Sequence, residues 1–263
     1  MPADVWADGD RYELYVGRWS RLVAPQFVRW LDLPAQSAWL DFGCGTGALT
    51  GAIFEHADPR LVIGCDRSPS YVDFAARRMP DARARFVVAE LSDLPGTEGG
   101  FDACVAGLVL NFLPDPRAGI EALMSRARPG VTIAGYVWDY AEGMELMRVF
   151  WDAAVALDPA ARALDEGRRF PLCRPEPLRR LYHECGLRDV AVREIDVPTE
   201  FPDFDDYWRP FLGGQGPAPT YAMRLSPERR GRLEQEIRRR MGVEPDGRIR
   251  LTARAWAFRG ATA

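Results

Sequence analysis

A glycine-rich turn carries the strongest chemical signal in this sequence. The stretch DFGCGTGA, which begins at Asp41, follows a short apolar run and precedes a helix-like segment. Such a turn presents backbone N–H groups and lets the main chain approach a nucleotide-like ligand closely. Gly43, Gly45 and Ala48 fit the dinucleotide pattern G-x-G-x-x-G/A. A second pattern ends on Gly47 instead and includes Asp41, so the glycines alone do not choose the ligand.

Two aspartates beside this turn narrow the choice. Asp66 ends the next apolar run, where a carboxylate accepts hydrogen bonds from both hydroxyls of a ribose. NAD and S-adenosylmethionine both carry that ribose, so Asp66 indicates an adenosine and no more. Asp41 lies next to the turn, where its charge would repel a pyrophosphate but attract an ammonium or a sulfonium. Asp41 therefore favours S-adenosylmethionine.

Alternating strands and helices must position these residues. Predicted strands are 37–42, 60–66, 84–90, the start of 101–113, and 131–139. Predicted helices are 47–57, 68–80 and 115–130. This alternation is typical of βαβ units and a parallel sheet. Near-continuous apolar strands such as ACVAGLVL suit a sheet that is covered on both faces.

The second half of the chain departs from this rhythm. The alternating patterns of 187–198 and 247–260 predict an antiparallel pair that closes one edge of the sheet. Residues 199–246 are too many for a plain connection, so we interpret them as an inserted cap. The chain is then one α/β domain with a Rossmann-like, doubly wound, mostly parallel seven-stranded sheet. Its predicted parts are N-terminal helices in 1–36, a core of 37–198 and 247–263, and the cap, all within a single domain of 1–263.

Several ordered motifs resemble a known family. LDFGCGTG, VIGCDRSPSYVDFAARR, FVVAELSDLP, FDACVAGLVLNFLPDP and RARPG, spread over 37–139, resemble the class I S-adenosylmethionine-dependent methyltransferases of the small-molecule, ubiquinone/menaquinone methyltransferase-like type. The resemblance implies S-adenosyl-L-methionine as cofactor, S-adenosyl-L-homocysteine as product and a small-molecule methyl acceptor. The sequence departs from the family pattern at Glu90, where an aspartate is usual, at Asn111, where a histidine is frequent, and at Val131, where a second glycine is usual.

The resemblance also implies which residues hold the cofactor. Asp66 would bind the ribose, Glu90 the adenine amino group, and the Leu91 backbone N–H a ring nitrogen. Arg18, in the N-terminal helix, could pair with the cofactor carboxylate, although ordinary packing of that helix on the sheet explains it equally well. The predicted cofactor-binding residues are Arg18, Asp41, Gly43, Cys44, Gly45, Gly47, Asp66, Arg67, Glu90, Leu91 and Leu108.

The acceptor side is less defined. Displacement of an activated methyl group needs alignment and desolvation more than a base, so neither His56 nor His183 is required. Tyr15 and Asn111 are the predicted catalytic residues, since both are expected beyond the carboxyl ends of the strands. Trp138, at the end of a strand, and Gln215, in the glycine-rich FLGGQGPAP, are the predicted substrate residues. Core packing and a plain surface loop are the alternatives for the last two.

Composition excludes several other classes. The net charge of −4 does not suit binding to a phosphate backbone, so we predict no nucleic-acid partner. Five cysteines without a C-x-x-C pair, and only two histidines, argue against a disulfide framework and a metal site. The start lacks a signal-peptide pattern and no run is long and apolar enough to span a bilayer. We therefore expect a soluble, cytoplasmic protein without membrane insertion, and the oligomeric state stays open.

Two further functions stay open at this point. One is a methyltransferase-like protein that binds S-adenosylmethionine without transferring its methyl group, because catalysis by alignment leaves no required base in the sequence. The other is an NAD(P)-dependent oxidoreductase, which rests only on the G-x-G-x-x-A pattern and Asp66.

Overall fold

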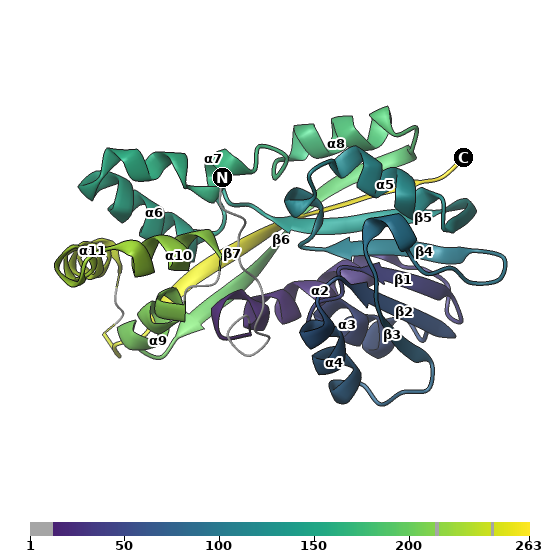
Figure 1. Ribbon diagram of the computed structural model, residues 1–263, viewed down its shortest axis with the longest axis horizontal. Helices are drawn as coiled ribbons and strands as arrows, with labels where there is room; N and C mark the ends of the chain where they lie inside the picture. The colour runs from purple at the N-terminus through teal and green to yellow at the C-terminus, as the bar shows by residue number, and fades with distance from the viewer. Residues whose placement is uncertain (1–12, 214–215, 243–244) are drawn as a thin grey trace. The chain divides into compact units, whose positions relative to one another are not determined.

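The computed structural model describes residues 13–213, 216–242 and 245–263. Its strands form one seven-stranded sheet in the order β3-β2-β1-β4-β5-β7-β6 (Figure 1). The strands are β1 (Ala38–Phe42), β2 (Leu61–Asp66), β3 (Ala84–Val88), β4 (Phe101–Gly107), β5 (Ala127–Trp138), β6 (Arg188–Phe201) and β7 (Ile249–Ala261). The predicted mostly parallel sheet with an antiparallel C-terminal pair at its edge is confirmed.

The described residues group into two compact units. Unit 1 comprises 13–19, 138–171 and the described part of 196–254. Unit 2 comprises 20–137, 172–195 and 255–263. Residues 138–171, which the sequence assigned to the core, group with the segment interpreted as a cap. The division into one core and one cap stays a prediction.

Unit 2 is built around β1, whose five residues are all buried. Parallel partners flank this strand, with Asp41 opposite Gly64 on β2 and opposite Val105 on β4. In Figure 1, α3 (Ala48–His56) and α4 (Pro69–Arg78) lie on one side of the sheet, and α5 (Pro116–Met124) and α8 (Pro175–Glu184) on the other. Burial on both faces explains why these strands are continuously apolar.

The boundaries of some predicted elements differ from the structure. The strand predicted within 101–113 ends at Gly107, and the one predicted for 84–90 ends at Val88. The helix predicted for 115–130 ends at Met124, because β5 already begins at Ala127. The pairing of β4 with β5 shifts register between Phe101 and Ala103, so the first residues of β5 do not show a regular strand pattern.

Unit 1 is mostly helical. Its helices are α6 (Glu145–Leu157), α7 (Glu166–Arg169), α9 (Phe204–Trp208), α10 (Pro217–Arg224) and α11 (Pro227–Arg240). Short helical turns are η1 (Glu13–Gly17), η4 (Pro159–Ala163) and η5 (Arg209–Gly213) in this unit, and η2 (Leu91–Asp93) and η3 (Leu110–Phe112) in unit 2. Stacked aromatic side chains, such as Phe150 on Phe211 with ring centroids 4.6 Å apart, form its core.

The remaining helix, α2 (Arg18–Leu31), follows η1. Its residues Val23, Phe27 and Leu31 recur at intervals of four and are buried, as expected for an amphipathic helix. Among the described residues, no helix has the length and apolar character needed to cross a membrane. The same residues contain no group of three or more potential metal ligands.

Candidate functional site

The glycine-rich turn folds back against the end of β2. The backbone N–H groups of Gly43 and Cys44 both donate to the Cys65 carbonyl, at 2.8 and 3.0 Å. Gly43 has a φ of +68°, and a Cβ placed there would lie 2.2 Å from Cγ2 of Val109. Both the backbone conformation and the lack of space require glycine at this position. The turn therefore packs closely against the Val109 side chain.

Asp41 lies immediately before this turn and is completely buried. Its Oδ2 accepts a hydrogen bond of 2.6 Å from Oγ1 of Thr50, while Oδ1 has no partner. Burial raises the pKa of Asp41 to about 7, and the nearby charge of Asp66 adds to this effect. A buried carboxyl oxygen without a hydrogen-bond partner lowers the stability of the fold, and a bound ligand could supply the missing partner. Thr50, which positions Asp41, was not predicted from the sequence.

Asp66 is tied to the same turn by its carboxylate. Oδ2 accepts from the N–H of Gly45 at 3.1 Å, and Oδ1 accepts from the N–H of Ser68 at 2.9 Å. Burial raises the pKa of Asp66, and these two hydrogen bonds oppose that shift. The structure thus brings Asp41 and Asp66 to the carboxyl ends of adjacent strands, which makes the site acidic.

The next strand end carries the residues predicted to hold an adenine ring. The N–H of Ala89 donates to the Asp66 carbonyl at 3.1 Å, which places Glu90 directly after this contact. Glu90 is exposed and caps η2, and Leu91 is half-buried at its start. Arg67 is exposed after β2. The cofactor contacts predicted for these residues stay predictions.

The end of β4 is strained and polar. Leu108 has a φ of +62°, a conformation that costs free energy for a residue with a side chain. Its N–H donates to the Tyr136 carbonyl at 2.7 Å, and the chain then turns into η3. Asn111, within η3, is 9% exposed, and neither polar atom of its amide has a hydrogen-bond partner. An unpartnered buried amide can donate to and accept from a ligand.

Cys44 is buried within the turn. Burial and the charges of Asp41 and Asp66 raise the pKa of its thiol well above the ordinary value. The thiol is therefore protonated at neutral pH and does not act as a nucleophile. Gly47 directly precedes α3 and has a φ of +83°, and a Cβ placed there would lie 3.3 Å from Cβ of Ala75. The N-terminus of α3 therefore packs closely on α4.

Unit 1 contains Arg18, which was predicted to bind the cofactor from the N-terminal segment. The guanidinium of Arg18 pairs with Asp206 at 2.9 Å and lies 4.4 Å from the centre of the Trp19 ring. Its Nε and Nη2 atoms are buried without a hydrogen-bond partner. One edge of the guanidinium is therefore left for an anion such as a carboxylate. The pairing of Arg18 with a cofactor carboxylate stays a prediction.

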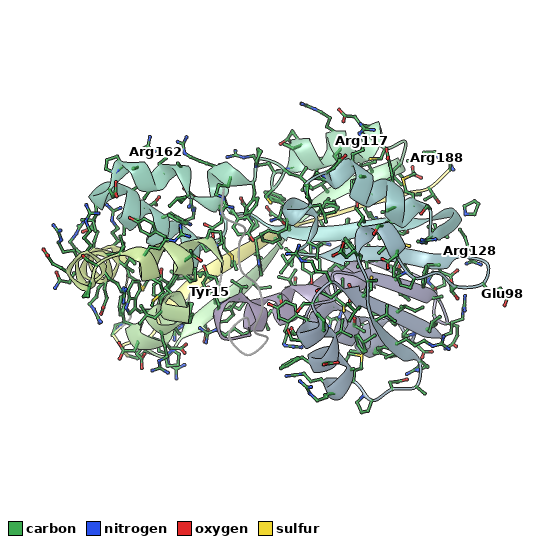
Figure 2. All side chains as sticks on the ribbon, in the orientation of Figure 1. Tyr15, Glu98, Arg117, Arg128, Arg162 and Arg188 are labelled. Carbon is green, nitrogen blue, oxygen red and sulfur yellow. The ribbon has the colours of Figure 1, made fainter. Side chains whose placement is uncertain are left out.

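Two further predicted residues are buried in unit 1. Tyr15, labelled in Figure 2, is 3% exposed, and its ring packs edge-on against Phe211 at 5.4 Å. Its hydroxyl has no partner, and burial raises its pKa well above the ordinary value. Trp138 is also buried, with its indole Nε1 unpartnered. Gln215 lies outside the described residues.

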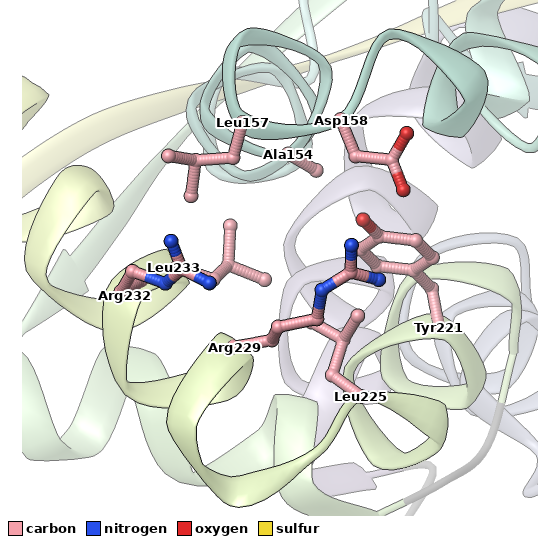
Figure 3. A pocket seen from close by; sticks show the side chains of 8 residues that line it. All are labelled: Ala154, Leu157, Asp158, Tyr221, Leu225, Arg229, Arg232 and Leu233. Atoms are coloured by element: carbon pink, nitrogen blue, oxygen red, sulfur yellow. The ribbon is translucent and has the colours of Figure 1, made fainter.

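A cavity of about 130 Å³ opens on unit 1 between α6, α10 and α11 (Figure 3). Its lining residues are Ala154, Leu157, Asp158, Tyr221, Leu225, Arg229, Arg232 and Leu233. None of them was predicted as a site residue. Arg229 and Arg232 are exposed on α11, so the cavity is a surface hollow with a charged rim rather than an enclosed site.

Comparison with known families supports the resemblance seen in the sequence. Residues 40–130 match a family described as a methyltransferase domain. The matched segment includes the glycine-rich turn, Asp66, Glu90 and Asn111.

Curated relatives are similar to part of the chain. This chain is 33% identical over 118 residues to the tRNA (carboxymethyluridine(34)-5-O)-methyltransferase ALKBH8 of Mus musculus. The match covers 43% of this chain and 17% of that protein. This chain is also 33% identical over 92 residues to a demethylmenaquinone methyltransferase of Clavibacter sepedonicus. That match covers 35% of this chain and 37% of that protein. The matches span well under half the length of either relative.

Solved structures share the fold over most of the chain. A putative methyltransferase from Bacillus halodurans superposes with a TM-score of 0.59 at 11% identity, covering 90% of this chain and 97% of that one. The phosphoethanolamine N-methyltransferase 2 of Haemonchus contortus, in complex with S-adenosyl-L-methionine, superposes with a TM-score of 0.58 at 15% identity. That match covers 97% of this chain and 56% of the other. Together the comparisons confirm the resemblance to class I S-adenosylmethionine-dependent methyltransferases and the predicted fold.

Proposed function

We propose that this protein, which carries a methyltransferase domain in residues 40–130, transfers the methyl group of S-adenosyl-L-methionine to a small-molecule acceptor. When bound, the cofactor supplies a methyl group that is already activated on a sulfonium. The proposal is carried by one observation above all: Asp41 is buried beside the glycine turn and has a carboxylate oxygen without a hydrogen-bond partner. That oxygen suits a cationic ligand and opposes a pyrophosphate.

The other residues of unit 2 fit the same cofactor. The carboxylate of Asp66 has lone pairs left for ribose hydroxyls beyond its two backbone hydrogen bonds. Glu90 is exposed at the next strand end, where an exocyclic amino group of adenine could approach it. These features fit the adenosine that S-adenosylmethionine and NAD(P) share, and Asp41 is the residue that favours S-adenosylmethionine.

Asn111 is the residue that we propose to orient the acceptor. Its amide is fixed in η3 and offers two donor hydrogens and one acceptor oxygen that the fold leaves unpaired. Correct orientation of an acceptor atom lowers the barrier to an in-line displacement without a general base. The role of the protein is then to hold the acceptor in place and exclude water.

An RNA acceptor is a second candidate, because the mouse relative is named as a tRNA methyltransferase. The net charge of −4 favours a small molecule instead, because binding to a phosphate backbone relies on a positively charged surface. The arginine-rich helix α11 is the part of the chain that best suits RNA, although three of its arginines pair with Glu234 or Glu236 of the same helix. We also propose the cytoplasm as the place of action.

Calorimetric titration tests the cofactor assignment. S-adenosylhomocysteine should bind, and NADH should not bind at submillimolar concentration. The reverse result would overturn the proposal. The acceptor class is tested by measuring S-adenosylhomocysteine formation with a panel of small metabolites and with total tRNA. Turnover with tRNA alone would replace the small-molecule acceptor by RNA, and no turnover with either would indicate a non-methylating binder.

A further inference from the structure

Thr50 holds the Asp41 carboxylate from a different element of unit 2. It lies in the first turn of α3, nine positions after Asp41 in the chain. Both residues are completely buried, and Oγ1 of Thr50 donates to Oδ2 of Asp41 at 2.6 Å. A hydroxyl that donates to a buried carboxylate favours its ionised form over its neutral form. Thr50 therefore acts on the charge of Asp41 as well as on its position.

The other surroundings of Asp41 oppose its ionisation. Burial is the largest influence that raises its pKa, and the charge of Asp66 acts in the same direction. Three titratable groups interact electrostatically with Asp41, and none of them is a cation: Asp66, Cys44 and Cys65. Hydrogen bonding from the side chain and the backbone of Thr50 lowers the pKa of Asp41. Without Thr50, the carboxyl group would therefore hold its proton to a higher pH.

The Thr50 hydroxyl also determines which carboxylate oxygen is left for a ligand. Oδ2 of Asp41 is occupied by this hydrogen bond, whereas Oδ1 is buried and has no hydrogen-bond partner. Threonine is branched at Cβ, so its side chain adopts few rotamers in a helix. The start of α3 is in turn held by the close packing of Gly47 on Ala75 of α4. The donor itself has little freedom, and the carboxylate is fixed through it.

We propose that Thr50 is a positioning residue of the cofactor site, which holds Asp41 ionised through Oδ2 and leaves Oδ1 for the ammonium group of the cofactor. A cation binds the carboxylate and not the neutral carboxyl group, so a protonated Asp41 must release its proton to solvent before the ammonium can take its place. The affinity for the cofactor therefore rises with pH until Asp41 is ionised in the free protein, and then becomes constant. This inference rests on the proposed methyltransferase function and adds the control of its cofactor affinity.

The pH dependence of cofactor affinity tests this proposal. S-adenosylhomocysteine, which carries the same ammonium group, is titrated calorimetrically into the full-length protein from about pH 5.5 to 8.5. The affinity of the native protein should rise up to about pH 7 and level off above it. In Thr50→Val, which keeps the shape of the side chain without its hydroxyl, the rise should continue to a higher pH. The affinity of this variant at pH 7 should be about five- to fiftyfold lower.

Matched variants separate this role from a packing role of Thr50. Thr50→Ser keeps the hydroxyl and should reproduce the native pH profile. Thr199→Val removes a buried hydroxyl that has no hydrogen-bond partner and should also leave the profile unchanged. The ligand titrates identically in every comparison, so its own ionisation cancels.

The possible outcomes also separate this proposal from the function on which it rests. A pH-independent affinity of the native protein, or an affinity of Thr50→Val that is unchanged or lowered equally at every pH, would overturn the role of Thr50 alone. Failure of the native protein to bind S-adenosylhomocysteine at any pH would overturn the proposed function itself. Should Thr50→Val fail to fold, Thr50→Ala decides the question by the same measurement.

Discussion

Asp41 is the residue on which the choice of ligand depends. The sequence indicated only that a carboxylate stands beside the glycine turn. The structure adds that this carboxylate is completely buried, bonded to Thr50 through one oxygen and free at the other. Because burial strengthens electrostatic interactions, we expect the ionised form of Asp41 to discriminate between cationic and anionic ligands more strongly than an exposed carboxylate would.

Asp66 allows a direct test of the ribose assignment. Asp66→Asn keeps the shape of the side chain but removes its charge and one acceptor for ribose hydroxyls. We expect the affinity for S-adenosylhomocysteine to fall by roughly 1–3 kcal/mol, measured by calorimetric titration. Asp81→Asn, at an exposed carboxylate paired with Arg83, should leave the affinity unchanged. An unaltered dissociation constant in Asp66→Asn would refute the placement of the ribose.

Asn111 allows a similar test on the acceptor side. Because its amide has no partner in the fold, Asn111→Ala should not lower the melting temperature. Loss of acceptor orientation should reduce kcat by about 10- to 100-fold, with the affinity for S-adenosylhomocysteine unchanged. Ser125→Ala, on the exposed end of α5, serves as the control. A lowered melting temperature with normal kcat would instead show that Asn111 has a structural role.

The strand ends decide where these residues lie. The sequence predicted a strand that starts at 101, but its apolar pattern does not reveal that the chain leaves the sheet after Gly107. A Cβ at Gly107 would lie 2.8 Å from Oη of Tyr136, and Leu108 then adopts a positive φ. This change of direction, set by β5, brings Asn111 into η3. The sequence predicted Asn111 as a site residue, whereas the neighbouring strand β5 sets the direction of the chain that carries it.

The glycine turn between β1 and α3 allows a test at the level of the element. Gly43→Ala places a methyl group at 2.2 Å from Val109 in a conformation with φ of +68°. We expect a loss of roughly 2–4 kcal/mol in the free energy of unfolding, measured with urea. Gly96→Ala, where a Cβ would meet no atom within 4 Å, should be close to neutral. Adding Val109→Ala should restore part of the stability lost by Gly43→Ala, and no recovery would mean that the backbone strain dominates.

At the scale of the whole molecule, two buried carboxyl groups among the described residues have pKa values near neutrality. Burial raises the pKa of Asp41 from 3.8 to about 7 and that of Glu166 from 4.5 to about 7. At pH values between the ordinary and the raised pKa of each group, the folded protein keeps a proton on that carboxyl which the unfolded chain has already released. The free energy of unfolding therefore falls as the pH rises through this window. Each group contributes a loss of about 3–5 kcal/mol at most.

Urea unfolding at pH 5 and pH 7.5 measures this effect. Carboxylates with lowered pKa values, such as Asp81 at about 2 beside Arg83, are ionised in both states above pH 5 and contribute no slope in this window. The comparison is made against the double variant Asp41→Asn, Glu166→Gln, which cancels the contributions of all other groups. The native protein should lose more stability than the double variant between the two pH values. Equal losses would show that neither carboxyl has a raised pKa in the folded state.

The sequence by itself determined the features that depend on the spacing of nearby residues. Glycines at alternate positions, a carboxylate before them and another at the next strand end are all set by short-range geometry, and so is the alternation of strands and helices. Only the tertiary structure decided which polar atoms are left unpaired. Arg18 meets Asp206 from 188 positions away, and Tyr15 packs against Phe211 from an equally distant segment. Such contacts follow from the packing of apolar surfaces, which depends on the whole chain, and no local pattern encodes them.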